Sequence, residues 1–314
     1  MLQSPAPMHI PDGFLSLVIS LAFWVATIIM VGLAITKTNK TLGEKQIPLM
    51  GVMAAFIFAA QMLNFPVAGG TSGHFLGGAL AAIVLGPWAG ILVMTSVISV
   101  QGLLFQDGGL LVMGANIFNM GILTAVIGFG LYRLVLGRSR GIRLAVAGVA
   151  AWTATMSAAL LTSLELWLSG TTRLEIVIPA MLGVHTLIGI GEALITVAAI
   201  AFIEQTRPDL LSPEKTEASG GNGWVIAGLA LTLLAVLISP FASAHPDGLE
   251  RVAEDIGFLN QSLGAPYQIL SDYTIPFLGE TGLSTILAGA IGAIVVFGIL
   301  FLIGRNLSKS RHTK

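Results

Sequence analysis

Long apolar runs separated by short polar stretches dominate the chain. Runs of this kind are typical of membrane-spanning helices, because the strands of a membrane barrel would alternate apolar and polar positions. They predict nine helical segments, over residues 14–36, 47–64, 74–86, 87–105, 112–136, 142–169, 175–204, 223–240 and 282–303. The segment 74–86 is too short to cross a bilayer alone, since a crossing takes about 20 residues. We expect either a tilted half-helix there or one partner of a broken pair interrupted at Gly86 and Pro87.

The composition agrees with a membrane protein. Of the 314 residues, 55% are hydrophobic and only 10% are charged, whereas soluble proteins carry about 25% charged residues. The lipid bilayer is therefore the expected solvent. A net charge of −1 argues against nucleic acid as a partner, and the absence of cysteine excludes disulfides and thiolate metal ligands. We predict an all-α integral membrane protein, a helical bundle of about seven segments plus a two-helix C-terminal extension.

Basic residues indicate the orientation. If the N-terminus lies outside, 13 of the 15 lysines and arginines fall in inner loops, and only Arg173 and Arg251 fall outside. The positive-inside rule then predicts a multi-pass protein of the inner (plasma) membrane with an extracytoplasmic N-terminus and a cytoplasmic C-terminus. A polar linker rich in Pro, Gly and Ser, residues 206–222, separates a body at 8–205 from a tail at 223–314.

Two histidines stand in turn-forming stretches on the expected outer face. His9 precedes the first segment, and His74 ends the glycine-rich loop 69–74. Neutral imidazole is the commonest metal ligand, and a histidine second from a free amine chelates through amine, amide and ring, which favours square-planar Ni(II) or Cu(II). The alternative is a pair of interfacial side chains that hold no ligand.

Further polar side chains follow in the apolar segments. Asn116 and Asn119 are three positions apart and so share a helix face, and His185 and Glu192 are two turns apart. The asparagines would either bond neighbouring helices or orient a ligand loop. The His–Glu pair would either fix packing or act chemically, as intramembrane carboxylates often do. Ala22 and Ala26 give the first segment a small-residue face.

Five ordered motifs resemble one family. They resemble the cobalt/nickel substrate-binding (S) components of energy-coupling factor transporters, of the CbiM/NikM type, over about residues 8–205. The motifs are MHIPDGF at 8–14, GGTSGH at 69–74, LGPWAG at 85–90, FQDGG at 105–109 and GANIFNM at 114–120. The loop HPDGLE at 245–250 resembles the small NikN/CbiN-like accessory component, fused here as a PDGLE segment.

The resemblance implies a site for transported Ni²⁺ or Co²⁺. Its ligands would be the amine of Met8, the amide and ring of His9, and the ring of His74. Residues that support these ligands would be Asp12, Gln106, Asp107, Asn116, Asn119, His185 and Glu192. Because seven residues precede Met8, we expect translation to begin at Met8, a leader to be removed, or the fourth ligand to differ.

The resemblance also implies partners: a transmembrane coupling (T) subunit, which Ala22 and Ala26 would contact, and two cytoplasmic ATPase subunits. The metal would supply cobalamin biosynthesis or nickel enzymes. The chain has no phosphate-binding Gly-x-x-x-x-Gly-Lys-Ser/Thr loop and no common hydrolase motif, so we expect neither ATP binding nor enzymatic activity. The alternative function is a secondary, proton-coupled divalent cation transporter using His185 and Glu192. The tail loop, with His245, would shuttle metal or only help to load the site.

Overall fold

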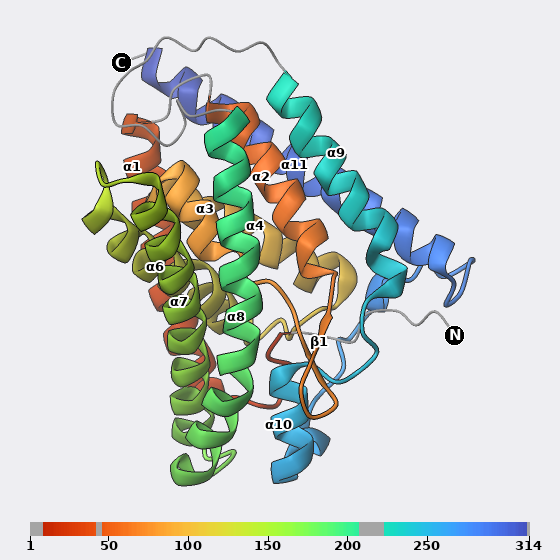
Figure 1. Ribbon diagram of the computed structural model, residues 1–314. Helices are drawn as coiled ribbons and strands as arrows, with labels where there is room; N and C mark the ends of the chain where they lie inside the picture. Colours follow the sequence, from red (N-terminus) through yellow and green to blue (C-terminus); the bar gives the residue numbers. More distant parts are fainter. Residues whose placement is uncertain (1–8, 42–45, 207–222, 313–314) are drawn as a thin grey trace.

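Helices form almost all of the structure, a computed structural model that describes residues 9–41, 46–206 and 223–312. Seven helical stretches are long and apolar enough to cross a membrane: Leu17–Lys40, Pro87–Phe105, Met113–Val135, Arg140–Leu168, Leu174–Thr206, Gly223–Phe241 and Gly282–Ser308. The shorter apolar helix Gln46–Gln61 adds to them. The predicted all-helical membrane protein is thus confirmed, and each of the nine predicted segments contains a helix (Figure 1).

The described part of the chain contains α-helices throughout its length. The α-helices are α1 (Leu17–Thr41), α2 (Gln46–Gln61), α3 (Gly78–Leu85), α4 (Pro87–Val100), α5 (Met113–Asn116), α6 (Thr124–Tyr132), α7 (Arg140–Leu168), α8 (Leu174–Thr206), α9 (Gly223–Ile238), α10 (Gly248–Ile256) and α11 (Gly282–His312). Two π-helical turns, η1 (Gln101–Phe105) and η2 (Ile117–Leu123), continue α4 and α5. Single 3₁₀ turns are η3 (Arg133–Val135), η5 (Ser239–Phe241), η6 (Leu259–Gln261) and η7 (Ser271–Tyr273).

The short third segment is one half of a broken helix pair. Gly86 separates α3 from α4 with φ 82° and ψ 160°, a conformation that residues with a side chain rarely adopt. Pro87 then begins α4, where its missing N–H costs no helical hydrogen bond. A Cβ on Gly90 would lie 2.8 Å from the Cα of Ala82, so this glycine lets α4 approach α3 closely. Of the two alternatives, the broken pair is the one found.

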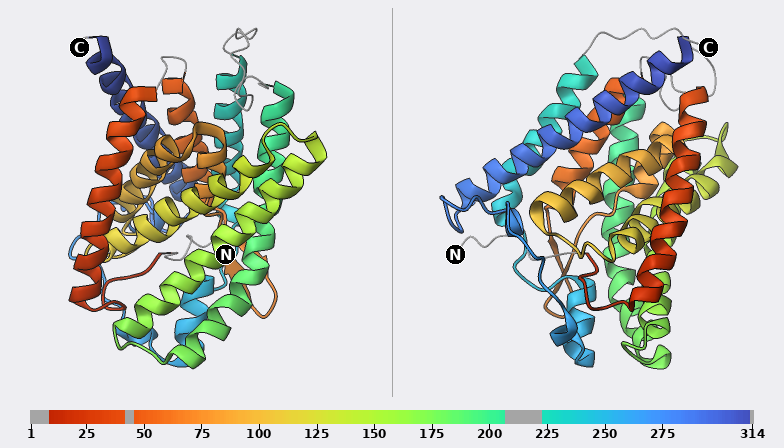
Figure 2. Two further views of the ribbon diagram at one scale, coloured as in Figure 1. Left: turned by 90° about the vertical axis from the view of Figure 1, so that its left-hand side faces the viewer. Right: turned by 180° about the vertical axis from the view of Figure 1, so that it is seen from behind.

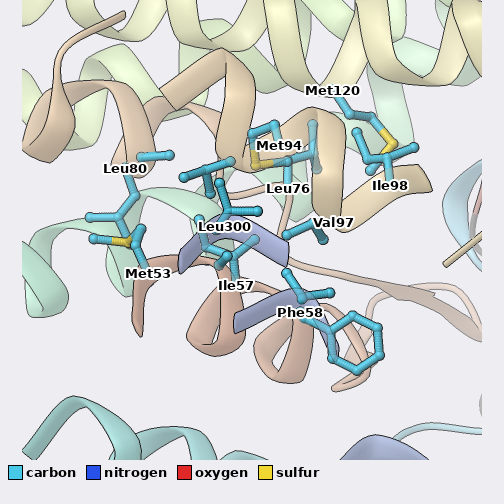
Figure 3. Packing of buried hydrophobic residues seen from close by; sticks show 14 of the residues in the cluster. Met53, Ile57, Phe58, Leu76, Leu80, Met94, Val97, Ile98, Met120 and Leu300 are labelled. Atoms are coloured by element: carbon cyan, nitrogen blue, oxygen red, sulfur yellow. The ribbon is translucent and has the colours of Figure 1, made fainter. Parts of the chain in front are cut away.

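The tail packs into the main core instead of standing beside it. Figure 3 shows Leu300 of α11 in one buried cluster with Ile57 and Phe58 of α2 and with Met94 and Val97 of α4. Close approach again needs glycine, because a Cβ on residue 292 of α11 would lie 2.0 Å from the ring of Phe58. The tail also contains a third helix, α10, between its two long ones, which the apolar pattern did not predict because α10 is polar on one side.

Several loops gather at one end of the bundle, the lower end in Figure 1. Residues 9–16, the hairpin of β1 (Phe65–Val67) and β2 (Thr71–Gly73), the stretch 106–112 and α10 lie there together, as both views in Figure 2 also show. The hairpin is antiparallel, with Phe65 opposite Gly73 and Val67 opposite Thr71. The turn between α6 and α7, which carries Arg133 and Arg138, lies toward the other end. The segments that carry His9 and His74 therefore both lie at the loop-rich end.

Candidate metal site

The segment that carries His9 is held by one carboxylate. Asp12 is 8% exposed and accepts hydrogen bonds from three consecutive backbone amides, those of Leu110 (3.0 Å), Leu111 (2.9 Å) and Val112 (3.2 Å). These amides precede α5, so the negative charge also lies at a helix start, where it is favourable. Asp12 therefore ties the N-terminal segment to the loop 106–112.

Asn116 makes a second connection to the same segment. Its Oδ1 accepts from the amide of Ile10, and its Nδ2 donates to the carbonyl of Ile10, both at 3.0 Å. The glycines of the loop are required by space: a Cβ on Gly109 would lie 2.2 Å from the Asp12 nitrogen, and one on Gly108 2.8 Å from the Cβ of His9. The backbone on both sides of His9 is thereby fixed.

The ring of His9 is buried, with 4% of the residue exposed. Its Nδ1 donates to the carbonyl oxygen of Asp107 at 2.9 Å and lies 3.4 Å from the Asp107 carboxylate. The other Oδ of that carboxylate accepts from the hydroxyl of Tyr273 at 2.8 Å. With Nδ1 donating, Nε2 carries the lone pair, and it has no hydrogen-bond partner among the described residues.

His74 follows β2 and is 7% exposed. Its Nδ1 donates to Oδ1 of Asp247 at 3.1 Å, and its Nε2 also lacks a partner among the described residues. Burial lowers the pKa of His74, but the charge and hydrogen bond of Asp247, together with the charges of Asp107 and Glu192, bring that pKa above its ordinary value. For the carboxyl of Asp247 burial has the opposite sign and raises the pKa. The charge and hydrogen bond of His74 nevertheless help to bring the pKa of Asp247 below its ordinary value. The two side chains form an attractive buried pair.

The two imidazoles meet edge to face beside a small cavity. Their ring centroids are 5.7 Å apart, with an interplanar angle of 77°. Both line a cavity of about 50 Å³, together with Asn116, Asn119, Met120, Thr155, Thr162, Met181, His185 and Asp247. Such a volume accommodates an ion or a water molecule. Two buried imidazoles beside one small cavity are suited to a soft or borderline cation.

The described part of the chain supplies only part of a ligand set. Within it, no group of three or more His, Asp or Glu side chains is arranged to hold a metal, and Met8 lies outside the described residues. The amide-and-ring chelate that the resemblance implies requires Nδ1 of His9, because only that nitrogen closes a six-membered ring with the amide of the same residue. In this conformation Nδ1 faces Asp107, so a half-turn of the ring is needed for that chelate.

Asn119 connects the cavity to a carboxylate that the sequence reasoning missed. Asn119 donates to Oε2 of Glu165 at 2.8 Å and to Thr162 at 3.2 Å. Glu165 lies in α7 with 0% exposed, and its Oε1 has no partner among the described residues. The signal was present, since an intramembrane glutamate is a functional candidate by default. Asn119 thus serves helix contact, and Asn116 holds the segment that carries His9.

The expected His185–Glu192 pair is not found. His185 lines the cavity, but its Nδ1 donates to the carbonyl of Met181, one turn earlier in α8. Glu192 is 1% exposed and accepts from the amides of Leu76 (2.6 Å) and Gly77 (2.9 Å). These amides precede α3 and are unpaired within the helix, which explains why the carboxylate binds there and not to His185. Glu192 therefore holds the backbone that follows His74.

Other predicted residues lie farther from the histidines. Gln106, in a left-handed conformation with φ 56°, accepts from Ser271 at 2.8 Å and so contacts the tail. Ala22 is exposed and Ala26 partly exposed on α1. His245 is also exposed, but its carbonyl accepts from Ser72 at 2.8 Å. Asp247, two residues later, is the tail residue that bonds to His74.

Comparison with protein families agrees with this geometry. The family model described as the cobalt uptake substrate-specific transmembrane region, CbiM, matches residues 9–210. The chain belongs to the CbiM family. The model of the PDGLE domain matches residues 222–309, so this CbiM-family chain carries a PDGLE domain after its CbiM region.

Relatives of the CbiM-family chain include fused proteins of similar length. A protein of Archaeoglobus fulgidus that carries the name NikMN is 38% identical over 309 residues, covering 95% of this chain and 98% of that one. The fused nickel transport protein NikMN of Rhodobacter capsulatus is 32% identical and covers 68% of this chain and 66% of its own length. The cobalt transport protein CbiM of Sorangium cellulosum is 33% identical and covers 65% and 94%.

Solved structures of transition metal transporters are similar to this chain in fold. The crystal structure of a truncated transition metal transporter is 34% identical, with a TM-score of 0.57, and covers 63% of this chain and 99% of that one. The CbiM-family chain is accordingly a multi-pass membrane component of cobalt/nickel transport, and it belongs to a transport family and not to an enzyme family. The resemblance of the five sequence motifs and of the PDGLE segment is confirmed.

Proposed function

We propose that the chain is the substrate-binding component of an ATP-driven energy-coupling factor importer for Ni²⁺ or Co²⁺. The observation that carries this proposal is that the two buried imidazoles of His9 and His74 lie with their ring centroids 5.7 Å apart beside one cavity, and that Nε2 of His74 has no hydrogen-bond partner among the described residues. The metal-binding part would span 8–205, the cytoplasmic linker 206–222, most of which lies outside the described residues, and the accessory part 223–314. The orientation expected from the basic residues would place the cavity on the extracytoplasmic face.

The ligands in this proposal are His74, His9 and the amine of Met8. Nitrogen donors suit Ni(II) best, although Co(II) accepts the same set. Mass spectrometry of the purified protein tests the amine. Full metal affinity in a protein whose mature N-terminus is Met1 contradicts the amine as a ligand.

Equilibrium binding tests the histidines. We expect His9→Ala and His74→Ala each to abolish binding of Ni²⁺ and Co²⁺ in isothermal titration of the purified full chain. The exposed His245 provides the control, since His245→Ala leaves both imidazoles in place. Unchanged affinity in both site variants removes the basis of the proposal. Titration of both metals against the same preparation identifies the preferred cargo.

A proton-coupled secondary transporter receives little support from the contacts. It requires a relay between His185 and Glu192, but their hydrogen bonds go to Met181 and to the amides of Leu76 and Gly77. The proposed importer instead needs a coupling subunit and two ATPases. Uptake into proteoliposomes distinguishes the two: the importer requires co-reconstituted partners and ATP, whereas a secondary transporter works alone and stops when a protonophore is added.

A further inference from the structure

The PDGLE domain reaches the candidate metal site through Asp247. Its carboxylate accepts the Nδ1 proton of His74, which belongs to the CbiM region, across 173 positions of sequence. Two further hydrogen bonds fix the same strand to the same loop: the Ser72 amide donates to the carbonyl of Pro246 at 2.9 Å, and its hydroxyl to that of His245 at 2.8 Å. The PDGLE loop therefore lies along β2 just before the ligand.

The hydrogen bond decides which ring nitrogen of His74 is available to bind a metal. A neutral imidazole carries one proton, and the nitrogen that donates it cannot bind metal. Because Nδ1 donates to Asp247, the lone pair of His74 stands on Nε2, which has no partner among the described residues. A carboxylate in this place also fixes the ring plane and increases the basicity of the metal-binding nitrogen.

The placement of Asp247 fits a role beyond helix capping. Asp247 is 3% exposed, and a buried carboxylate is costly unless it is paired. As the first residue before α10, it also accepts from the amide of Leu249, but at 3.5 Å, a longer contact than the 3.1 Å to His74. The shorter contact, between two buried groups, is the one made to the ligand.

We propose that Asp247 is a positioning residue of the metal site: the PDGLE domain completes the site by holding the ring of His74 so that Nε2 is the nitrogen available to the metal. This inference rests on the proposed role of His74 as a ligand. It gives the fused domain a defined contribution to substrate binding, namely one side chain that orients a ligand of the other domain.

Three substitutions in the full chain separate orientation from capping. Asp247→Asn keeps an oxygen that accepts from His74 and can cap α10. Asp247→Ser keeps a capping oxygen on a side chain too short for His74, and Asp247→Ala removes both. Asp255→Ala, which breaks only an exposed pair with Arg251 on the same helix, is the control. Ni²⁺ affinity is measured by isothermal titration, and ligand geometry by the visible absorption of bound Ni(II).

We expect Asp247→Ser and Asp247→Ala to weaken Ni²⁺ binding alike, by about 10- to 100-fold as for other residues that orient metal-binding histidines, and to alter the visible spectrum. Asp247→Asn should bind more tightly than either. Wild-type affinity in Asp247→Ser overturns the proposal in favour of capping, and wild-type affinity in Asp247→Ala overturns it outright. If His74→Ala itself binds normally, the proposed function fails first, so the two failures are distinguishable. Size-exclusion profiles identify any variant that does not fold.

Discussion

Position 109 requires glycine because no space is left there for a side chain. The His9 segment crosses so close to this residue that a Cβ would lie 2.2 Å from both the nitrogen and Oδ1 of Asp12. We expect Gly109→Ala to displace Asp12, to lower stability by about 1–3 kcal/mol, as overpacking usually does, and to weaken Ni²⁺ binding. Thermal unfolding in detergent and isothermal titration measure both effects. Gly130→Ala, where nothing lies within 4 Å, should change neither; an equal effect of both substitutions contradicts the explanation.

Glu192 gives a second test at the level of a residue. Its two oxygens accept from two neighbouring amides, so Glu192→Gln replaces one acceptor by an NH₂ group that faces a donor. A buried amide left without an acceptor costs about 1–3 kcal/mol, and we expect this loss of stability. We also expect weaker Ni²⁺ binding, because His74 lies two residues before Leu76, whose amide Glu192 binds. Glu175→Gln, on the exposed start of the same helix, is the matched control. Wild-type melting of Glu192→Gln is incompatible with this account.

The residues that sequence reasoning found and those it missed differ in how they are recognised. His9 and His74 stand in local motifs, and their types alone suggest metal chemistry. Asp247 was missed although its motif was noticed, because its role depends on a partner 173 positions away. The separation of His185 from Glu192 was also unpredictable, since helical spacing shows a shared face but not that backbone amides at the start of α3 compete for the carboxylate.

Helices were the best-predicted level of structure. Lipid requires every backbone group to be bonded within its own segment, so apolar length determines the element, and the predicted segment 87–105 coincides with Pro87–Phe105. The π-helical turns were not predicted, because one extra residue per turn leaves an apolar pattern unchanged. The turn Ile117–Leu123 directly follows Asn116 and contains Asn119, and both asparagines still line one cavity.

Helix α1 is the element whose proposed contact with the coupling subunit can be tested. Only 17% of its apolar window is buried within the chain, and Ala22 is exposed on it. Small residues let helices approach closely in lipid. We expect Ala22→Trp to reduce ATP-dependent uptake strongly while Ni²⁺ affinity stays at the wild-type value. Val149→Trp, at an exposed site on α7, should leave uptake intact; equal uptake by both variants speaks against α1 as the contact.

At the scale of the whole molecule, the candidate site lies where the two family regions meet. His9 and His74 come from the CbiM region, whereas Asp247 and Tyr273 come from the PDGLE domain. Tyr273 donates to Asp107, whose carbonyl in turn accepts from His9, so both histidines have a partner that depends on the tail. The arrangement of these loops could not be read from the sequence, because it depends on contacts between residues more than 160 positions apart.

Metal binding should therefore stabilise both regions together. A ligand that binds only the folded state stabilises it by about 2.7 kcal/mol at a hundredfold excess over its Kd, and here the bound cation would connect loops that belong to separate parts of the chain. We expect Ni²⁺ to raise the Tm of the full chain in detergent in a single transition, and a chelator to reverse the rise. His74→Ala should show no rise, and Mg²⁺, which prefers oxygen ligands, should produce none in the wild type. A rise confined to one of two separate transitions contradicts a site shared between the CbiM region and the PDGLE domain.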